Sequence, residues 1–225
     1  MLTTIAGRTI ELVQGDITKE TTVAIVTAAN SALAGGGGVD GAVHAAAGPD
    51  VLAELGRKYP GGCRTGFAVI SGGGKLAAKW ILHAVGPKFT GGIGDAAFLT
   101  GAYDACLKLC VKHGIKSIAF PSIATGAYGY PVADAAQVAL GTVARHLEKF
   151  PQPAVVRFVL FDEATFEAYH QAMEHLGLEH GHADHAGPGL GLHKPTGDPH
   201  LKAGKGPAME RTPQRQNRSA PRTGG

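Results

Sequence analysis

The sequence predicts an α/β protein whose sheet is covered by helices on both faces. Two observations support this class: apolar runs alternate with runs of helical periodicity along the chain, and the apolar runs are continuous. Glycine-rich segments follow two of these runs. In open α/β sheets, ligands bind outside the carboxyl ends of the strands, so the segments that follow the strands are the places to search for chemistry.

The expected elements follow one another closely along residues 1–177. Apolar residues that recur every 3.6 residues indicate helices, and continuous apolar runs indicate strands. A proline marks the start of one helix, and glycines mark the ends of others. Strands are expected at 9–14, 23–28, 66–71, 79–85, 117–122 and 154–161, and helices at 39–48, 50–59, 96–114, 131–150 and 162–177. A chain of 225 residues, of which 44% are hydrophobic, is sufficient for one sizeable core.

The composition changes at residue 178. Residues 178–225 contain 15 Gly or Pro and no Val, Ile, Phe, Tyr or Trp, so they cannot bury enough apolar surface to offset the entropy of ordering. We therefore expect a domain at 1–177 and a disordered, basic tail at 178–225. Five histidines in the tail could chelate a soft cation weakly, but they suit a solvated low-complexity segment better, and no metal site is predicted.

Charge and cysteine content exclude several classes of protein. The tail has seven Lys or Arg and four Asp or Glu, so the entire net charge of +3 lies there and the body is neutral. A neutral body does not suit duplex nucleic acid. No apolar run is long enough to span a membrane and no secretory signal is evident. The three cysteines are expected to be reduced thiols in a cytoplasmic protein.

Two glycine-rich loops follow expected strands and lead into expected helices. Residues 35–38 are four glycines, which let the backbone approach a ligand because no Cβ intervenes. Consecutive N–H groups at a helix N-terminus bind anions. The loop at 122–131 repeats this pattern and adds the hydroxyls of Ser122 and Thr125 beside Gly126. Two such loops at one edge of a sheet predict a site for two linked phosphates.

The motif of the first loop is weak when it is taken alone. Residues 36–41 match G-x-G-x-x-G, but the connection from the preceding strand is long for a Rossmann turn. No G-x-x-x-x-G-K-[ST] occurs, which argues against a P-loop. A flexible connector is an alternative for the glycine run, and the second, matching loop favours ligand binding.

Several side chains beside the loops allow a structural and a functional interpretation. Asp16 suits a turn or helix cap, or a carboxylate that accepts a hydrogen bond from an exocyclic amine. Phe161 suits a core position or a stacking platform. Asn30 suits a turn and Asp40 a helix cap, but a carboxylate beside a pyrophosphate is unfavourable unless it binds a ribose hydroxyl or orients a water. His44, one helical turn after Asp40, is expected to pack.

One further histidine, His83, lies within an expected strand and is interpreted as a satisfied core residue. No G-x-S-x-G motif occurs, so the histidines do not fit a serine hydrolase with a nucleophile elbow.

These segments together resemble the macrodomain family, and in particular its MacroD-type branch. The matching stretches are "GDIT", "AANSALAGGGGVDGAVHAAAG", "ILHAVGP", "FPSIATGAYGYP" and "VLFDEATFEAY", in the family's order over about residues 8–176. The resemblance implies a three-layer α/β/α sandwich with a central mixed sheet that binds ADP-ribose. MacroD-type members remove mono-ADP-ribose from acidic side chains of proteins and deacetylate O-acetyl-ADP-ribose.

The resemblance also implies a role for each matching residue. Asp16 would accept from the adenine amine, Ile17 would offer its backbone, and Phe161 would stack on the adenine. Asn30 would bind hydroxyls of the distal ribose, and Asp40 would orient a water or the substrate. The phosphates would be held by two sets, Gly37, Gly38 and Val39 for one and Ser122, Thr125, Gly126 and Ala127 for the other, and Tyr128 would cover the distal ribose.

The implied mechanism needs no metal, cofactor or covalent nucleophile. Asp40 and a diphosphate oxygen would hold a water near the anomeric carbon or the ester carbonyl, and positioning would do most of the work. Two positions depart from the family: Thr27 replaces the first Asn of Asn-Ala-Ala-Asn, and Ala45 stands where Arg is common. Neither departure removes Asp40 or Asn30, so a hydrolase is expected. The alternatives are a non-catalytic ADP-ribose reader and a macrodomain for another nucleotide or an RNA end.

Overall fold

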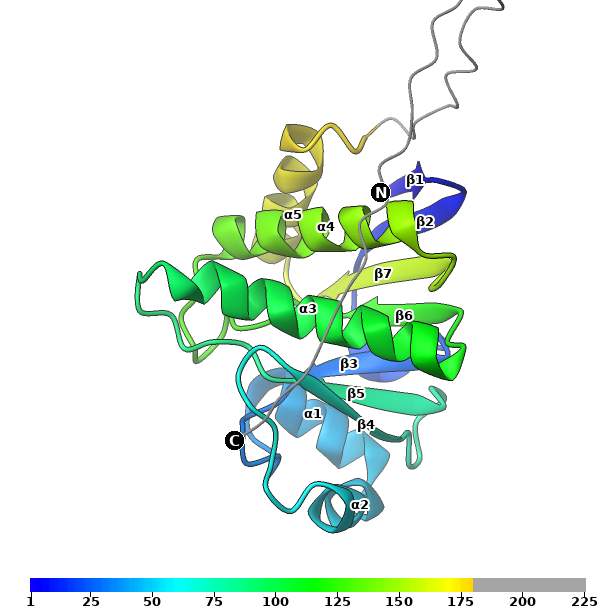
Figure 1. Cartoon of the computed structure of the whole chain (residues 1–225), viewed down its shortest axis with the longest axis vertical. Coiled ribbons are helices and arrows are strands. Elements are labelled where there is room, and N and C mark those ends of the chain that lie inside the picture. Colours follow the sequence, from blue (N-terminus) through cyan, green and yellow to red (C-terminus); the bar gives the residue numbers. More distant parts are fainter. Residues whose placement is uncertain (180–225) are drawn as a thin grey trace, which may run out of the picture. The chain divides into compact units, whose positions relative to one another are not determined.

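The computed structural model describes residues 1–179, so nearly all of the predicted tail lies outside the described residues (Figure 1). The described part contains seven strands, five α-helices and one short 3-10 helix, η1. The strands are β1 (Leu2–Ile5), β2 (Arg8–Gln14), β3 (Ala24–Ala28), β4 (Ala68–Gly72), β5 (Trp80–Ala84), β6 (Ser117–Phe120) and β7 (Val155–Leu160). The helices are η1 (Ile17–Lys19), α1 (Gly38–Ala47), α2 (Asp50–Lys58), α3 (Gly94–His113), α4 (Val132–Lys149) and α5 (Glu163–His175).

The strands form one mixed sheet in the order β1-β2-β7-β6-β3-β5-β4. The five central strands, β2, β7, β6, β3 and β5, are parallel to one another, and the antiparallel strands β1 and β4 lie at the two edges. The carboxyl ends of the five parallel strands therefore meet at one edge of the sheet, in that order. Strand β1 was not expected from the sequence, because it is a four-residue edge strand with a single partner.

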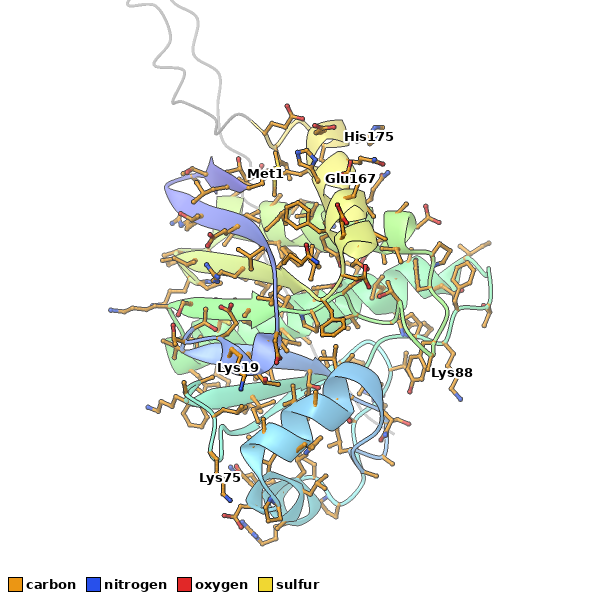
Figure 2. The ribbon with its side chains drawn as sticks, turned by 180° about the vertical axis from the view of Figure 1, so that it is seen from behind. Met1, Lys19, Lys75, Lys88, Glu167 and His175 are labelled. Carbon is orange, nitrogen blue, oxygen red and sulfur yellow. The ribbon has the colours of Figure 1, made fainter. Side chains whose placement is uncertain are left out.

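Two separate apolar cores lie on the two faces of the sheet. The first joins alternate strand residues such as Leu82, Phe120 and Phe158 to helices α3, α4 and α5, and the second joins Ile25 and Ile81 to α1 and α2. Figure 1 shows α3 and α4 in front of the sheet, and Figure 2 shows α1 on the opposite face. The predicted three-layer α/β/α arrangement with a mixed sheet is confirmed.

The state of the cysteines and the end of the packed body were also predicted from the sequence. Cys63, Cys106 and Cys110 are free and buried, as expected for reduced thiols. Leu178 packs against the first core, and its N–H donates to the carbonyl of Met173, so the packed body reaches at least this residue. None of the helices within residues 1–179 has the length and apolar character needed to span a bilayer.

Candidate functional site

A cavity of about 280 Å³ opens at the carboxyl edge of the parallel strands. Its lining combines the end of β3, the first glycine loop with the start of α1, the end of β5, and the second loop after β6. Nine residues predicted from the sequence line it: Asn30, Gly37, Gly38, Val39, Asp40, Ser122, Gly126, Ala127 and Tyr128. The two glycine-rich loops, almost 100 residues apart in the chain, thus lie at one edge of the sheet, as their sequence pattern predicted.

The first loop is shaped by backbone contacts that only glycine permits. A Cβ on Gly41 would lie 2.6 Å from the carbonyl oxygen of Gly36, so the loop could not pass so close to α1 with any other residue there. Helix α1 begins at Gly38, whose φ is +55°, and no side chain within residues 1–179 caps its first N–H groups. These N–H groups and the positive end of the helix dipole face the cavity lining, which suits an anion.

The Asn30 side chain closes the same loop on itself. Its Nδ2 donates to the carbonyl of Gly35 at 2.7 Å, and its Oδ1 accepts from the N–H of Ala34 at 3.2 Å. Asn30 thus fills the turn role considered for it, while it also lines the cavity. Its predicted contact with ribose hydroxyls stays a prediction.

The second loop is supported from below by two buried tyrosines. The Tyr103 hydroxyl of α3 accepts from the N–H of Ile123, and the Tyr169 hydroxyl of α5 donates to Ser122 Oγ at 3.1 Å. Thr125 Oγ1 donates to Ser122 Oγ at 2.9 Å, so its side chain organises the loop and does not line the cavity. Ala124 has a φ of +68°, which is a strained value for a residue with a Cβ. The loop is therefore held in one conformation by two helices.

Gly86, at the end of β5, allows this loop to approach the sheet. A Cβ there would lie 2.8 Å from Ile123 Cγ2 and 3.0 Å from Ala124 Cβ. Gly86, Tyr103 and Tyr169 were not predicted as site residues from the sequence. Their contribution depends on partners 20 to 66 residues away, and no local pattern announces it.

Asp40 lies in the first turn of α1 and is buried beneath the cavity. Its Oδ1 accepts from Thr27 Oγ1 at 2.9 Å and lies 3.6 Å from His44 Nε2. Its Oδ2 has no hydrogen-bond partner within residues 1–179, and a Cβ on Gly36 would be 3.5 Å from it. Burial raises the pKa of Asp40 above the usual carboxyl range, against the opposing effects of the Thr27 hydrogen bond and His44. One carboxylate oxygen is thus anchored and the other is available.

Further buried polar side chains lie behind Asp40. Thr27 on β3 is paired in register with His83 on β5, and the ring of His83 lies 5.7 Å from that of His44. His83 Nε2 is 2.8 Å from Ser71 Oγ, but its Nδ1 has no partner in the described part of the chain. Burial, with a smaller effect of His44, lowers the pKa of His83 to about 3, so the ring is neutral. His83 is a core histidine as expected, although only half satisfied.

Within the described residues, Asp40, His44 and His83 form a group that could hold a metal ion. One oxygen of Asp40 and one ring nitrogen each of His44 and His83 lie within 4.8 Å of one another. His44 was expected only to pack, but its ring nitrogen lies close to the Asp40 carboxylate. The one-turn spacing between the two residues was the sequence signal for this contact.

The remaining predicted residues lie beside the cavity, at the ends of β2 and β7. The N–H of Gly15 donates to the carbonyl of Leu160 at 2.9 Å, which places Asp16 and Phe161 on adjacent strand ends. Asp16 caps η1 through Thr18, and η1, which contains the buried Ile17, packs against α1. The side chain of Phe161 is 79% exposed, so the core interpretation of this residue is wrong.

Comparisons with known proteins agree with this geometry. Residues 26–139 match the model of the Macro domain family. The chain is 50% identical over 170 residues to a macro domain-containing protein of Caldanaerobacter subterraneus, a match that covers 74% of this chain and 97% of that protein. It is 49% identical over 171 residues to a Cronobacter turicensis protein named O-acetyl-ADP-ribose deacetylase, covering 75% and 97% of the two chains.

Solved structures give the same result. The Oceanobacillus iheyensis macrodomain with ADP superimposes with a TM-score of 0.75 at 40% identity, covering 78% of this chain and 95% of that one. The Trypanosoma brucei macrodomain in complex with ADP-ribose superimposes with a TM-score of 0.69 at 37% identity, covering 73% and 68%.

Proposed function

The chain belongs to the Macro domain family, and from this membership we propose that it binds ADP-ribose and hydrolyses esters of the distal ribose. The first activity is deacetylation of O-acetyl-ADP-ribose, the reaction in the names of several bacterial relatives that are 47 to 49% identical to this chain. Removal of mono-ADP-ribose from acidic side chains of proteins is the second, since it cleaves the same kind of bond. The cytoplasmic location expected from the sequence stays a prediction.

The order of the strand ends supports one direction for the ligand. Asp16 and Phe161 follow β2 and β7, the second loop follows β6, and the first loop follows β3. Adenine at the first pair, the diphosphate between the two loops and the distal ribose near Asn30 and Tyr128 would occupy these ends in sequence. Adjacent strands are about 4.8 Å apart, so an extended nucleotide can cross several of them.

The observation that carries the hydrolase proposal is the position of Asp40. An unpaired carboxylate oxygen buried beside an anion-binding loop costs stability unless it has a role there. Because burial raises the pKa of Asp40, its ionised form is a stronger base than an exposed carboxylate. Asp40 therefore suits a general base that holds a water through Oδ2 while Thr27 fixes Oδ1.

The proposed reaction is an ester hydrolysis. The water held by Asp40 attacks the carbonyl carbon of the acetyl ester and transfers a proton to the carboxylate. The bond between that carbon and the ribose oxygen then breaks, and the proton passes to the ribose oxygen. The products are acetate and ADP-ribose with a free hydroxyl, and the N–H groups of the two loops hold the diphosphate throughout.

A reader function is favoured by two features, one at the end of β3 and one in the first loop. Thr27 replaces the family's usual Asn, and the Asn30 amide is already engaged with the loop backbone. Calorimetry with ADP-ribose combined with a turnover assay on O-acetyl-ADP-ribose separates the two functions. Binding with release of acetate supports the hydrolase, whereas binding without turnover supports the reader, and failure to bind ADP-ribose refutes both.

A further inference from the structure

Three buried side chains beneath the cavity contain polar atoms without a partner. Within residues 1–179, five buried side-chain atoms have no hydrogen-bond partner, and three of the five are Asp40 Oδ2, His44 Nδ1 and His83 Nδ1. Asp40 is 4% exposed and His83 is completely buried. A buried polar atom without a partner costs free energy, and such atoms are rare in native proteins. Three of them in one cluster therefore indicate a site for a ligand.

The three side chains are close enough to share one metal ion. Asp40 and His44 lie one turn apart on α1, and the ring of His83, on β5, lies 5.7 Å from that of His44. One carboxylate oxygen and one nitrogen of each ring lie within 4.8 Å of one another. Tetrahedral ligands with bonds of about 2.0–2.1 Å lie about 3.4 Å apart. Side-chain rotations that close the widest gap by no more than about 1.5 Å would therefore complete the site.

Hydrogen bonds already hold the other side of two of these groups. His83 Nε2 lies 2.8 Å from Ser71 Oγ, and Asp40 Oδ1 accepts from Thr27 Oγ1 at 2.9 Å. A histidine that binds a metal normally uses its second nitrogen in such a bond, and a carboxylate ligand is supported in the same way, which fixes the orientation of both. The atoms left for an ion are then Nδ1 of His83 and Oδ2 of Asp40.

Charge and protonation in the cluster also suit a cation. A histidine must be neutral to bind a metal, and burial lowers the pKa of His83 to about 3, so no proton has to be displaced from it. The salt-bridge partner of Asp40 is His44, and no Lys or Arg of the described residues pairs with this carboxylate. A divalent ion would supply the charge that the buried carboxylate lacks nearby.

The types of ligand atom select among the common ions. Two imidazoles and one carboxylate are a set typical of Zn²⁺, which leaves the fourth tetrahedral position for a water. Ca²⁺ and Mg²⁺ prefer sites made of oxygen atoms. Asp40 lines the cavity, so an ion can reach the cluster from the surface without unfolding of the core.

We propose that Asp40, His44 and His83 form a binding site for Zn²⁺ that inhibits the hydrolase. The ion takes the Asp40 oxygen that would otherwise hold the attacking water, so the zinc-bound chain lacks its general base. The binding of zinc is independent of the proposed function, whereas its inhibitory effect rests on that function. Zinc-free chain is the active form, and zinc and the catalytic water compete for one carboxylate oxygen.

The first test measures binding of zinc alone to the full chain. Three clustered tail histidines could chelate zinc themselves, so every chain in the test carries His180→Ala, His182→Ala and His185→Ala. Calorimetry with zinc chloride then compares this parent chain with His83→Gln, whose amide can still bond to its neighbour on β4. The matched control is His146→Gln, which removes another buried histidine with an unpartnered Nδ1, on α4 and outside the cluster.

We expect one zinc ion per parent chain. His83→Gln should raise the Kd at least about tenfold, because loss of even a supporting group typically costs that much. His146→Gln should stay within about twofold. A second variant, Ser71→Ala, keeps all three ligands and should raise the Kd about tenfold, so the test does not depend on one buried substitution. Zinc at about 100 times its Kd should raise the Tm of the parent chain by about 5 °C or more.

The second test measures acetate release from O-acetyl-ADP-ribose as zinc is added. Each chain is compared with its own zinc-free rate. The parent chain and His146→Gln should lose half of their activity near the Kd for zinc and recover it with a chelator, and His83→Gln should need at least about tenfold more zinc. Zinc bound by the substrate diphosphate would affect all chains equally, so the difference between chains reports the cluster.

Three results would overturn the inference: no binding of zinc, as expected if a buried water satisfies the three atoms; equal binding by the parent chain and His83→Gln; or acetate release that zinc increases. A parent chain that binds zinc through His83 but releases no acetate without zinc would refute the proposed function and leave the metal site in place.

Discussion

The proposed ADP-ribose site runs along the strand ends, from β2 and β7 to β3, and its two ends differ in how they are built. At the β3 end, Asp40 is 4% exposed and is connected to Thr27, His44 and the buried His83. At the β2 and β7 end, Phe161 is 79% exposed, and the Asp16 carboxylate accepts hydrogen bonds from Thr18 of its own turn. The first end is organised before any ligand arrives, and the second is an open platform.

This difference assigns a different role to each end. A buried carboxylate with an unpaired oxygen costs folding free energy, and that cost is tolerated where it makes a base or orients a water. An exposed aromatic ring costs little, and it gains burial only when a base stacks on it. We therefore expect changes at the Asp40 end to act on turnover and changes at the Phe161 end to act on binding.

The largest expected effect follows from Asp40→Ala. Removing the base should lower kcat on O-acetyl-ADP-ribose by about 10²–10⁴-fold, because general-base catalysis typically contributes that much. The Kd for ADP-ribose should change by less than about threefold, since the loops that hold the phosphates remain. Stopped assays for acetate and calorimetry measure the two quantities. Turnover that survives this change would remove Asp40 from the mechanism.

Phe161→Ala is the complementary change at the other end. Loss of stacking should raise the Kd for ADP-ribose by about 10-fold or more, in line with about 1–3 kcal/mol per stacked base. The kcat should stay within about twofold, because the reacting groups are untouched. Phe150→Ala, a half-exposed aromatic outside the site, is the control and should leave Kd unchanged. A fall in kcat without a change in Kd would invert the assignment.

Thr27→Val tests the anchor of the catalytic carboxylate. The hydroxyl of Thr27 lowers the pKa of Asp40, so its removal raises that pKa further. Because the ionised form is the base, the acidic limb of the pH–rate profile should move to higher pH, and kcat at neutral pH should fall by about tenfold, the worth of a hydrogen bond to a charged group.

Two further variants at this position complete the test. Thr27→Ser retains the donor and should keep the wild-type profile. Thr27→Asn restores the residue that the family usually has, and a higher rate would show that the departure limits activity. A Thr27→Val profile that coincides with the wild type would mean that Oδ1 needs no anchor.

The motifs predicted the residues whose role depends on local backbone. The glycine runs marked both loops, and the spacing of Asp40 after residues 35–38 placed it at a helix start. The alternation of apolar runs predicted the layers, since parallel strands are buried on both faces.

The supporting residues could not be predicted, because they act through distant partners. Tyr103 and Tyr169 belong to amphipathic helix patterns that look like ordinary core, and only the fold brings their hydroxyls to Ser122 and Ile123. Likewise, Phe161 has an apolar side chain at a strand end, and its exposure depends on what neighbouring elements leave uncovered.

The smallest expected effect concerns stability and has the opposite sign to the loss of activity. Burial raises the pKa of Asp40 in the folded chain, so the folded state holds its proton more tightly than the unfolded state does. Above about pH 4, the usual carboxyl pKa, ionised Asp40 therefore costs folding free energy, and the cost disappears as the pH falls below that value.

Asp40→Asn removes this charge while its amide oxygen can still accept from Thr27. We expect Tm at pH 8 to rise by about 2–4 °C, as for a gain of about 1 kcal/mol in a domain of this size, and the gain to shrink toward pH 4. Asp95→Asn is the matched control: hydrogen bonds from Thr90 lower the pKa of Asp95, so its loss should decrease Tm. A lower Tm for Asp40→Asn at pH 8 would mean that the ionised carboxylate stabilises the fold, and the contrast between a costly catalytic end and an inexpensive binding end would no longer hold.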